Sequence, residues 1–261
     1  MPIITLTTDF GTGSPYVAAM KAVILGTAPD ATLVDISHDV PPFDMAEGAF
    51  VLWLGTRHFQ PGVVHVGVVD PGVGTERRPI AFALDGSFYV GPDNGLFDMV
   101  IRESENAPTD IFQLHRPTGI SATFEGRDVF APTAAALALG RSLSDLGLPV
   151  AGPPVKLPAQ GPAVVWVDRF GNLITNIDSE SFLTAPTRTV TEDWPRDVSQ
   201  ADSLFWLATG NTNRHRPGED GCLLLAARHA PRHDWQSRGF TEVINHRSIG
   251  RAWFPLAARQ T

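Results

Sequence analysis

The first half of the chain alternates short apolar segments with helix-like patterns, and this alternation restricts the possible folds more than any other feature. Residues 3–8, 31–36 and 63–69 have the length and apolar character of β-strands. The third segment is apolar almost throughout, which is typical of a strand covered on both faces of its sheet. Strands that alternate with helices indicate an α/β fold whose central sheet is largely parallel.

The segments between these strands carry start signals for helices. Ser14 before Pro15 places a capping residue ahead of a proline at the first helical position. Asp44 and Glu47 have the spacing of a capping box, which predicts the start of a second helix. An alanine-rich stretch over residues 128–139 predicts another helix further along the chain.

The character of the sequence changes near residue 150, where proline becomes frequent and short β-type runs follow. We therefore expect an N-terminal α/β domain over residues 1–150 and a proline-rich linker over residues 151–162. A smaller all-β domain, a barrel or a sandwich, is expected over residues 163–261.

Composition argues against several classes of protein. The single cysteine, Cys222, permits no intrachain disulfide, no apolar run is long enough to span a membrane, and the first residues lack a basic signal region. We therefore expect a cytoplasmic protein without a membrane partner.

The net charge is −8, with the negative excess in residues 1–181, and this argues against a nucleic-acid partner. The eight histidines show no metal-ligand spacing, so no metal site is expected.

Two aspartates follow the ends of predicted strands. Asp9 comes directly after the first strand and Asp70 after the third, and each precedes a turn that contains glycine. In an open α/β sheet, ligands bind beyond the carboxyl ends of the strands. Each aspartate is therefore a candidate site residue, although an aspartate that merely caps a turn fits the same pattern.

Two further clusters allow both a structural and a functional interpretation. Residues 123–128 place three ionisable side chains within four positions at the start of a predicted helix, as either a cap with ion pairs or part of a site. Residues 168–176, in the predicted second domain, form either a tight β-turn or a binding loop.

Taken together, five motifs occur in a fixed order along the chain. They are Thr-Thr-Asp-Phe-Gly at residues 7–11, Val-Asp-Pro-Gly-Val-Gly-Thr at 69–75, Gly-Pro-Asp-Asn-Gly-Leu at 91–96, Thr-Phe-Glu-Gly-Arg-Asp-Val-Phe-Ala-Pro at 123–132 and Asp-Arg-Phe-Gly-Asn-Leu-Ile-Thr-Asn at 168–176. This series resembles the S-adenosyl-L-methionine (SAM) hydrolase (adenosine-forming) family, also called SAM hydroxide adenosyltransferases, which is related to fluorinase and chlorinase. The resemblance covers residues 1–177 and resumes at residues 236–240.

The resemblance implies a two-domain subunit with a C-terminal β-barrel. It also implies a homotrimer whose sites lie between the N-terminal domain of one subunit and the C-terminal domain of the next. No cofactor is implied besides SAM, which is the substrate. The resemblance assigns ligand contacts as follows: Asp9 to the ribose hydroxyls, Phe43 to an aromatic contact, Asp168 to the methionine ammonium, Phe170 and Asn172 to the adenine, and Ser237 and Arg238 to the ligand at the barrel side.

The implied reaction is attack by water on the ribose 5′ carbon of SAM, which releases adenosine and L-methionine. In the family an Asp–Arg–His set directs the water. Asp70 and Arg77 match the first two positions, and Arg78 is the neighbour that competes with Arg77 for this role. Glu125 stands where the family has the histidine.

The replacement of histidine by Glu125 leaves three interpretations open. Glu125 can take over as water-orienting group or proton acceptor, or it can pair only with Arg127 and leave a slow enzyme. It can also mark a SAM- or adenosine-binding protein without catalysis. A SAM-dependent halogenase is a further alternative, but the halide-using relatives place tyrosine where this chain has Asp70.

Overall fold

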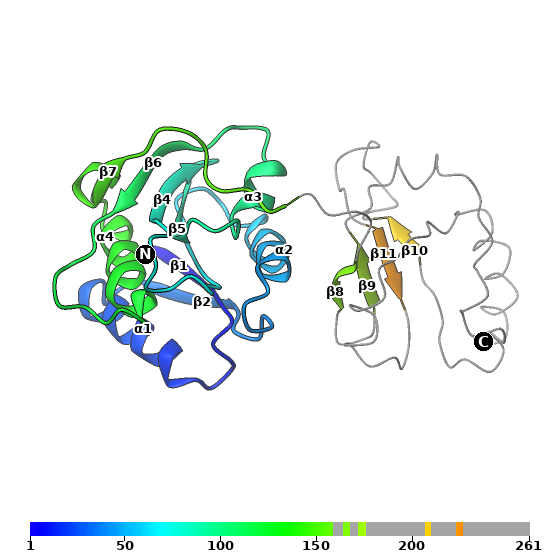
Figure 1. Cartoon of the computed structure of the whole chain (residues 1–261), viewed down its shortest axis with the longest axis horizontal. Coiled ribbons are helices and arrows are strands. Elements are labelled where there is room, and N and C mark those ends of the chain that lie inside the picture. The colour runs from blue at the N-terminus through cyan, green and yellow to red at the C-terminus, as the bar shows by residue number, and fades with distance from the viewer. Residues whose placement is uncertain (159–163, 168–171, 176–206, 210–222, 227–261) are drawn as a thin grey trace, which may run out of the picture. The chain divides into compact units, whose positions relative to one another are not determined.

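The computed structural model describes residues 1–158, 164–167, 172–175, 207–209 and 223–226. Contacts between residues divide the chain into two units, Met1–Pro158 and Ala159–Thr261. The first unit contains a seven-stranded sheet and its covering helices (Figure 1).

The order of the strands in the sheet is β2-β1-β3-β5-β4-β6-β7. The three segments expected as strands near the N-terminus form its parallel part, since β1 pairs in parallel with both β2 and β3, and β3 with β5. The strands are β1 (Ile3–Thr8), β2 (Thr32–Ser37), β3 (Val64–Val68), β4 (Pro79–Leu84), β5 (Ser87–Pro92), β6 (Thr109–Leu114) and β7 (Gly147–Pro149).

The prediction of a largely parallel sheet holds for only one half of it. Strands β5, β4, β6 and β7 pair antiparallel with one another. The β4–β5 connection is a two-residue turn in which Asp85 and Gly86 both have positive φ, of 50° and 77°. So short a connection can join only antiparallel neighbours, and the sheet therefore changes from parallel to antiparallel at β5.

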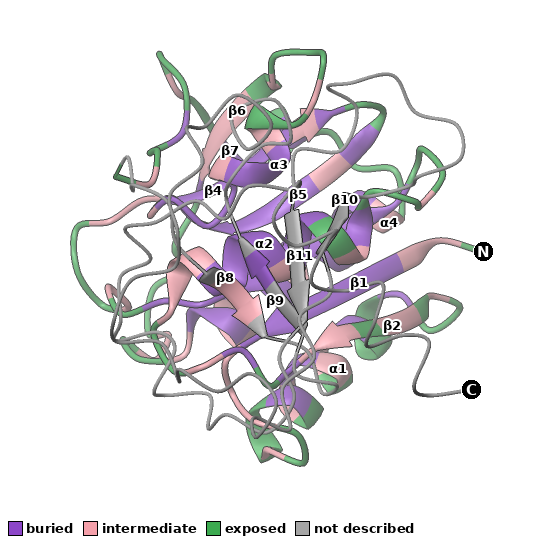
Figure 2. Ribbon diagram, turned by 90° about the vertical axis from the view of Figure 1, so that its right-hand side faces the viewer, coloured by how far each residue is buried: buried purple, intermediate pink, exposed green. Residues whose placement is uncertain are grey.

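Helices cover both faces of the parallel half. Helix α1 packs against α4, and α2 packs against α3, with the two pairs on opposite faces (Figure 1). As a result, β1 is buried along nearly its whole length between the two layers of helices (Figure 2). The helices are α1 (Pro15–Thr27), α2 (Met45–Thr56), α3 (Asp98–Arg102), the π-helical turn η1 (Gly126–Phe130), α4 (Ala131–Ala138) and the 3-10 turn η2 (Leu143–Asp145).

The predicted helix starts are confirmed. The Ser14 side chain accepts a hydrogen bond from the Tyr16 N–H at the start of α1, and Asp44 accepts one from the Glu47 N–H at the start of α2. Because the first N–H groups of a helix have no partner within it, these side chains supply the missing acceptors. The predicted helix over residues 128–139 is found as η1 followed by α4.

The strand order creates a crevice at the carboxyl end of β1. The chain leaves β1 for β2 on one side and later returns to β3 on the other, so the connections after β1 and β3 diverge. Thr8 at the end of β1 is paired with Val68 at the end of β3, which brings the residues that follow these strands to one edge of the sheet. Ligands of open α/β sheets bind at such a point.

The first half of the predicted linker packs on the first unit. The Val155 N–H donates a hydrogen bond of 2.7 Å to Asp93 Oδ1, and the Leu157 side chain lies against Gly95. This unit therefore ends at Pro158 rather than at residue 150. The sequence alone did not predict this boundary, because Asp93 and Gly95, which contact the segment, lie far from it along the chain.

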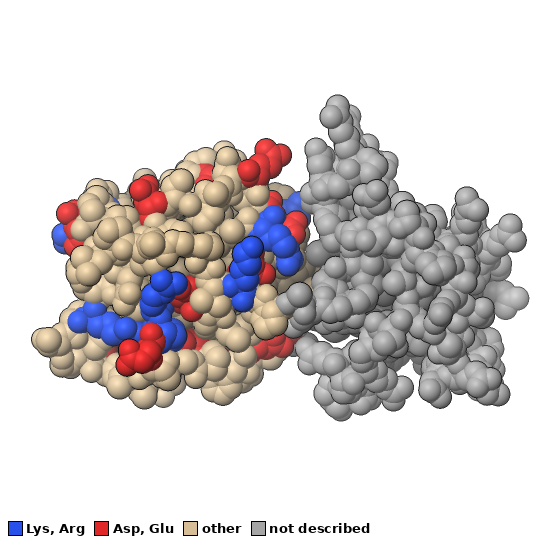
Figure 3. Space-filling view, turned by 45° about the horizontal axis from the view of Figure 1, so that its top comes forward, with Lys and Arg blue, Asp and Glu red and all other residues tan. Residues whose placement is uncertain are grey.

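The described residues of the second unit form a four-stranded antiparallel sheet in the order β10-β11-β9-β8. No helix among the described residues is long and apolar enough to cross a bilayer. On the face of the first unit drawn in Figure 3, Lys and Arg side chains lie in small groups, each with Asp or Glu beside it. The strands of the second unit are β8 (Val164–Val167), β9 (Asn172–Thr175), β10 (Leu207–Thr209) and β11 (Leu223–Ala226).

Candidate active site

A cleft of about 540 Å³ opens at the carboxyl ends of β1 and β3. It brings together four of the residues expected at the site, Asp9, Phe43, Asp70 and Glu125. Nine further residues complete the lining, namely Phe10, Tyr16, Pro42, Val68, Val73, Ser121, Thr123, Phe124 and Gly126.

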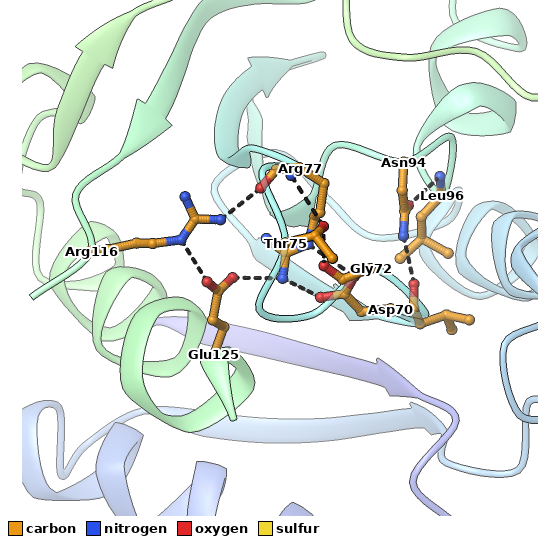
Figure 4. Close-up of polar contacts among 9 residues, drawn as sticks. Asp70, Gly72, Thr75, Arg77, Asn94, Leu96, Arg116 and Glu125 are labelled. Atoms are coloured by element: carbon orange, nitrogen blue, oxygen red, sulfur yellow. Dashed lines mark hydrogen bonds and ion pairs between the residues drawn. The ribbon is translucent and has the colours of Figure 1, made fainter. Parts of the chain in front are cut away.

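Asp70 is held by Arg77 through both carboxylate oxygens. Arg77 Nε donates to Oδ1 at 2.9 Å, and Arg77 Nη2 donates to Oδ2 (Figure 4). Both side chains are buried, at 5% exposure for Asp70 and 9% for Arg77. A planar guanidinium that binds both oxygens of a carboxylate fixes the orientation of that carboxylate.

The choice between the two neighbouring arginines falls on Arg77. Arg78 turns away from Asp70 and binds Asp93, with its Nε 2.9 Å from Oδ2. Adjacent residues of an extended segment direct their side chains to opposite sides, so only one of the two arginines can face the cleft.

Glu125 extends the ion pair on Asp70 into a chain of four charged groups. Its Oε2 lies 2.6 Å from Arg77 Nη2, and its Oε1 accepts a hydrogen bond of 2.6 Å from Arg116 Nε. The interpretation in which Glu125 pairs only with Arg127 is wrong, because Arg127 binds Asp128 instead, at 2.6 Å and 2.8 Å. Arg116 was not among the expected site residues, and it lies outside the five motifs.

Asp9 lines the same cleft as Asp70 but has different surroundings. Its Oδ2 accepts one hydrogen bond of 2.9 Å, from the Phe43 N–H. Burial raises the pKa of the Asp9 carboxyl above its usual value, and the negative charge of Asp70 acts in the same direction. The Phe43 side chain is 65% exposed, and its φ of 66° is rare for a residue with a side chain.

Three aromatic side chains line the cleft, and none of them was among the expected site residues. Phe10, Tyr16 and Phe124 contact one another edge to face, with ring centroids 5.1 to 6.2 Å apart. Rings in this arrangement offer an apolar surface on which a planar base can pack. The signal was present in the sequence, because Phe10 and Phe124 lie inside two of the five motifs.

The loop after β3 is braced from two sides, and this brace sets the position of Asp70. Asn94 Nδ2 donates a hydrogen bond of 2.9 Å to the Val69 carbonyl (Figure 4). Through this contact the Gly-Pro-Asp-Asn-Gly-Leu motif supports the loop that carries Asp70. Gly74, at φ 78°, lies so close to the Ala122 carbonyl that an added Cβ would be 2.6 Å from its oxygen. Only glycine permits both this backbone angle and this approach.

Comparison with known proteins identifies the family. The SAM hydroxide adenosyltransferase N-terminal domain matches residues 4–147. The chain belongs to this family.

Curated relatives of this chain include SAM hydrolases and fluorinases. An (R)-S-adenosyl-L-methionine hydrolase from Salinispora arenicola is 43% identical over 186 residues, which cover 66% of this chain and 70% of that protein. A hydrolase of the same name from Methanocaldococcus jannaschii is 40% identical over 192 residues, covering 69% and 68%. A fluorinase from an Actinoplanes species is more distant, at 29% identity over 205 residues and 68% of each chain.

Among solved structures, an uncharacterised conserved protein from Thermotoga maritima superposes with a TM-score of 0.69 at 30% identity. It covers 86% of this chain and 92% of its own. The likeness therefore extends beyond the part that the family's N-terminal domain covers.

The remaining expected site residues of this family member fall in the second unit. Asp168, Phe170, Ser237 and Arg238 lie outside the described residues, and Asn172 is the first residue of β9. In the described part of the chain, no three His, Cys, Asp or Glu side chains gather in a way that could hold a metal ion.

Proposed function

We propose that this chain hydrolyses SAM to adenosine and L-methionine by attack of water on the ribose 5′ carbon. The observation that carries the proposal is the meeting of Asp9 and Asp70 in one aromatic-walled cleft at the ends of neighbouring strands. Membership of the SAM hydroxide adenosyltransferase family and the hydrolase names of the nearer relatives support the same reaction.

The chemistry needs an oriented nucleophile more than an acid. The bond from C5′ to the sulfonium breaks with its electron pair going to sulfur, so methionine leaves as a neutral thioether without protonation. The water oxygen forms the new bond to C5′ and gives up one proton. Asp70 accepts a hydrogen bond from this water and directs its lone pair at C5′, and the proton passes through Asp70 to solvent.

Arg77 prepares Asp70 for this role. Because both carboxylate oxygens are fixed by one guanidinium, Asp70 does not have to reorient when the water approaches. Glu125 has one oxygen beside Arg77 and the other on Arg116, which favours a role in orienting the water-directing pair over that of a free proton acceptor.

Asp9 and the aromatic side chains bind the nucleoside. A carboxylate bound only by backbone N–H groups retains acceptor capacity for the two ribose hydroxyls, and Phe43 packs against the ligand beside it. We assign the methionine ammonium to Asp168, the adenine to Phe170 and Asn172, and the outer ligand contacts to Ser237 and Arg238. These assignments rest on the family resemblance.

Water is favoured over halide by the charge of Asp70. A carboxylate and a halide about 4 Å apart repel by about 4 kcal/mol at an effective dielectric constant of about 20. A halogenase would have to overcome this repulsion at the 5′ carbon, whereas water would be attracted.

We further propose the assembly that the resemblance implies. It consists of a barrel-shaped second domain over residues 163–261 and a cytoplasmic homotrimer whose sites join the N-terminal domain of one subunit to the second domain of the next. Sedimentation equilibrium of the full chain tests the trimer, and a monomer at micromolar concentration would contradict it.

Incubation of the full chain with SAM, followed by chromatography, tests the reaction. We expect adenosine and methionine in equal amounts, and in ¹⁸O-labelled water the label should enter the 5′ hydroxyl of adenosine. A parallel reaction in molar chloride should contain no chlorinated adenosine. Calorimetric binding of SAM without release of adenosine would instead identify a non-catalytic binding protein.

A further inference from the structure

Arg116 makes two short hydrogen bonds that connect Glu125 with the backbone of Arg77. Its Nε donates to Glu125 Oε1 at 2.6 Å, and its Nη2 donates to the backbone carbonyl of Arg77 at 2.6 Å (Figure 4). Arg116 follows β6 (Thr109–Leu114), so it reaches the site from the antiparallel half of the sheet.

The charges at the site explain why a second arginine is needed. Asp70 and Glu125 are both nearly buried, with exposed side-chain fractions of 5% and 4%, and both lie against the single guanidinium of Arg77. One cation between two buried carboxylates leaves an uncompensated negative charge, which is costly in a poorly solvated place. Arg116 supplies the missing positive charge, while a third of its own side chain remains in contact with solvent.

We propose that Arg116 is a positioning residue of this site, acting through Glu125 and Arg77 on the orientation of Asp70; this inference rests on the proposed function. By holding Glu125 Oε1, Arg116 directs Oε2 at Arg77. By holding the Arg77 carbonyl, it fixes the backbone from which the guanidinium reaches Asp70.

The geometry requires arginine rather than any cation. Nε and Nη2 point in nearly the same direction from a planar group, and here they bind two acceptors that belong to different segments of the chain. A lysine at this position keeps the charge but provides one flexible ammonium, which cannot hold both acceptors in a fixed arrangement.

The test compares five proteins and one matched control by steady-state adenosine release. They are the unchanged chain, Arg116→Met, Arg116→Lys, Glu125→Gln and the double variant of Arg116→Met with Glu125→Gln. Arg102→Met is the matched control, because Arg102 is an arginine on α3 with a side chain 57% exposed, which pairs with Glu103 and Asp98 and does not line the cleft. Thermal unfolding of each variant separates loss of function from loss of the fold.

We expect Arg116→Met to lower kcat by about 10- to 100-fold, as misplacement of a reacting group does, with KM within about threefold of the unchanged chain. Arg116→Lys should recover part of this loss, and Arg102→Met should have no effect. In the Glu125→Gln background the same Arg116→Met change should cost about fivefold less, because the charge that Arg116 compensates has been removed.

The possible failures are distinguishable. If the unchanged chain releases no adenosine, the proposed function is wrong and the inference falls with it. If the unchanged chain is active and Arg116→Met matches Arg102→Met, raises only KM, or costs the same with and without Glu125, the positioning role is refuted. If Arg116→Met does not fold, Arg116→Lys decides, since a full kcat in that variant would overturn the proposal.

Discussion

Asp9 and Asp70 are two aspartates in similar positions, within two residues of the ends of the paired parallel strands β1 and β3, yet their surroundings differ. Both carboxylate oxygens of Asp70 accept hydrogen bonds from the buried Arg77 guanidinium. That guanidinium pairs with Glu125, which in turn binds Arg116. Asp9 is held by backbone N–H groups only, among them that of Phe43, a residue that is mostly exposed.

In the proposed reaction, this difference assigns Asp70 to orienting the water and Asp9 to binding the substrate. A carboxylate locked by a guanidinium is suited to direct one small molecule along one line. A carboxylate held only by backbone N–H groups, with a pKa raised by burial, is suited to receive hydroxyl donors and a cationic ligand, which stabilise its ionised form. The same substitution at the two positions should therefore change different kinetic constants.

The largest expected effect is that of Asp70→Asn. The amide keeps the shape of the side chain but removes the charge that orients water and accepts its proton, so kcat should fall about 1000-fold with little change in KM. Rapid-quench measurement of adenosine in a single turnover checks this. A rate within about threefold of the unchanged chain would mean that another group directs the water.

Glycines on the two sides give a second comparison. Gly74, in the loop after Asp70, has a φ of 78° and the Ala122 oxygen only 2.6 Å from an added Cβ, whereas Gly11, after Asp9, has a φ of 88° and nothing within 4 Å. Gly11→Ala should cost about 1 to 2 kcal/mol of unfolding free energy from backbone strain alone.

Gly74→Ala should cost about 3 kcal/mol, because the clash adds to the strain and shifts the Asp70 loop. Urea unfolding of both variants measures the difference. Equal losses at the two positions would show that the loop after Asp70 is no more tightly placed than the loop after Asp9.

Asp9→Asn should weaken binding rather than slow the chemical step. A hydrogen bond to a charged group contributes about 1.5 to 3 kcal/mol, so KM for SAM should rise about 10- to 100-fold while kcat stays within about threefold. Steady-state kinetics for Asp9→Asn beside Asp70→Asn measures both constants. A fall confined to kcat would place Asp9 in the water-directing group instead.

The smallest expected effect is on stability as a function of pH. The raised pKa of Asp9 means that the folded protein loses stability as the pH rises from the ordinary carboxyl pKa of 3.8 through the raised value. Asp9→Asn does not titrate, so its melting temperature should exceed that of the unchanged chain at neutral pH. The two should converge below the ordinary pKa. Differential scanning calorimetry across this range checks the sign, and a variant that is less stable at neutral pH contradicts it.

Much of the fold followed from short-range patterns. The caps at Ser14 and Asp44 and the alternation of strands and helices are local features, and each was found where it was expected. The antiparallel pairing of β6 and of the three-residue β7 was not predicted, because both pair with partners distant in sequence, which no local pattern encodes.

The sequence predicted those cleft residues that lie in a motif, at a strand end or at a position matched by the family resemblance. Asp9, Asp70 and Glu125 were found in this way, and the cleft brings them together. Arg116, Tyr16 and the Asp93–Val155 contact were missed, because their importance comes from partners on other elements.

By itself, the amino-acid sequence determined the order of elements, the caps, the family motifs and the carboxylates beyond β1 and β3, because each depends on residues close together along the chain. Only the tertiary structure decided that Arg77 rather than Arg78 binds Asp70, and that Arg116 pairs with Glu125. The physical reason is that an ion pair depends on the direction of side chains and on which segments the sheet brings together, and neither is a property of a local stretch of residues.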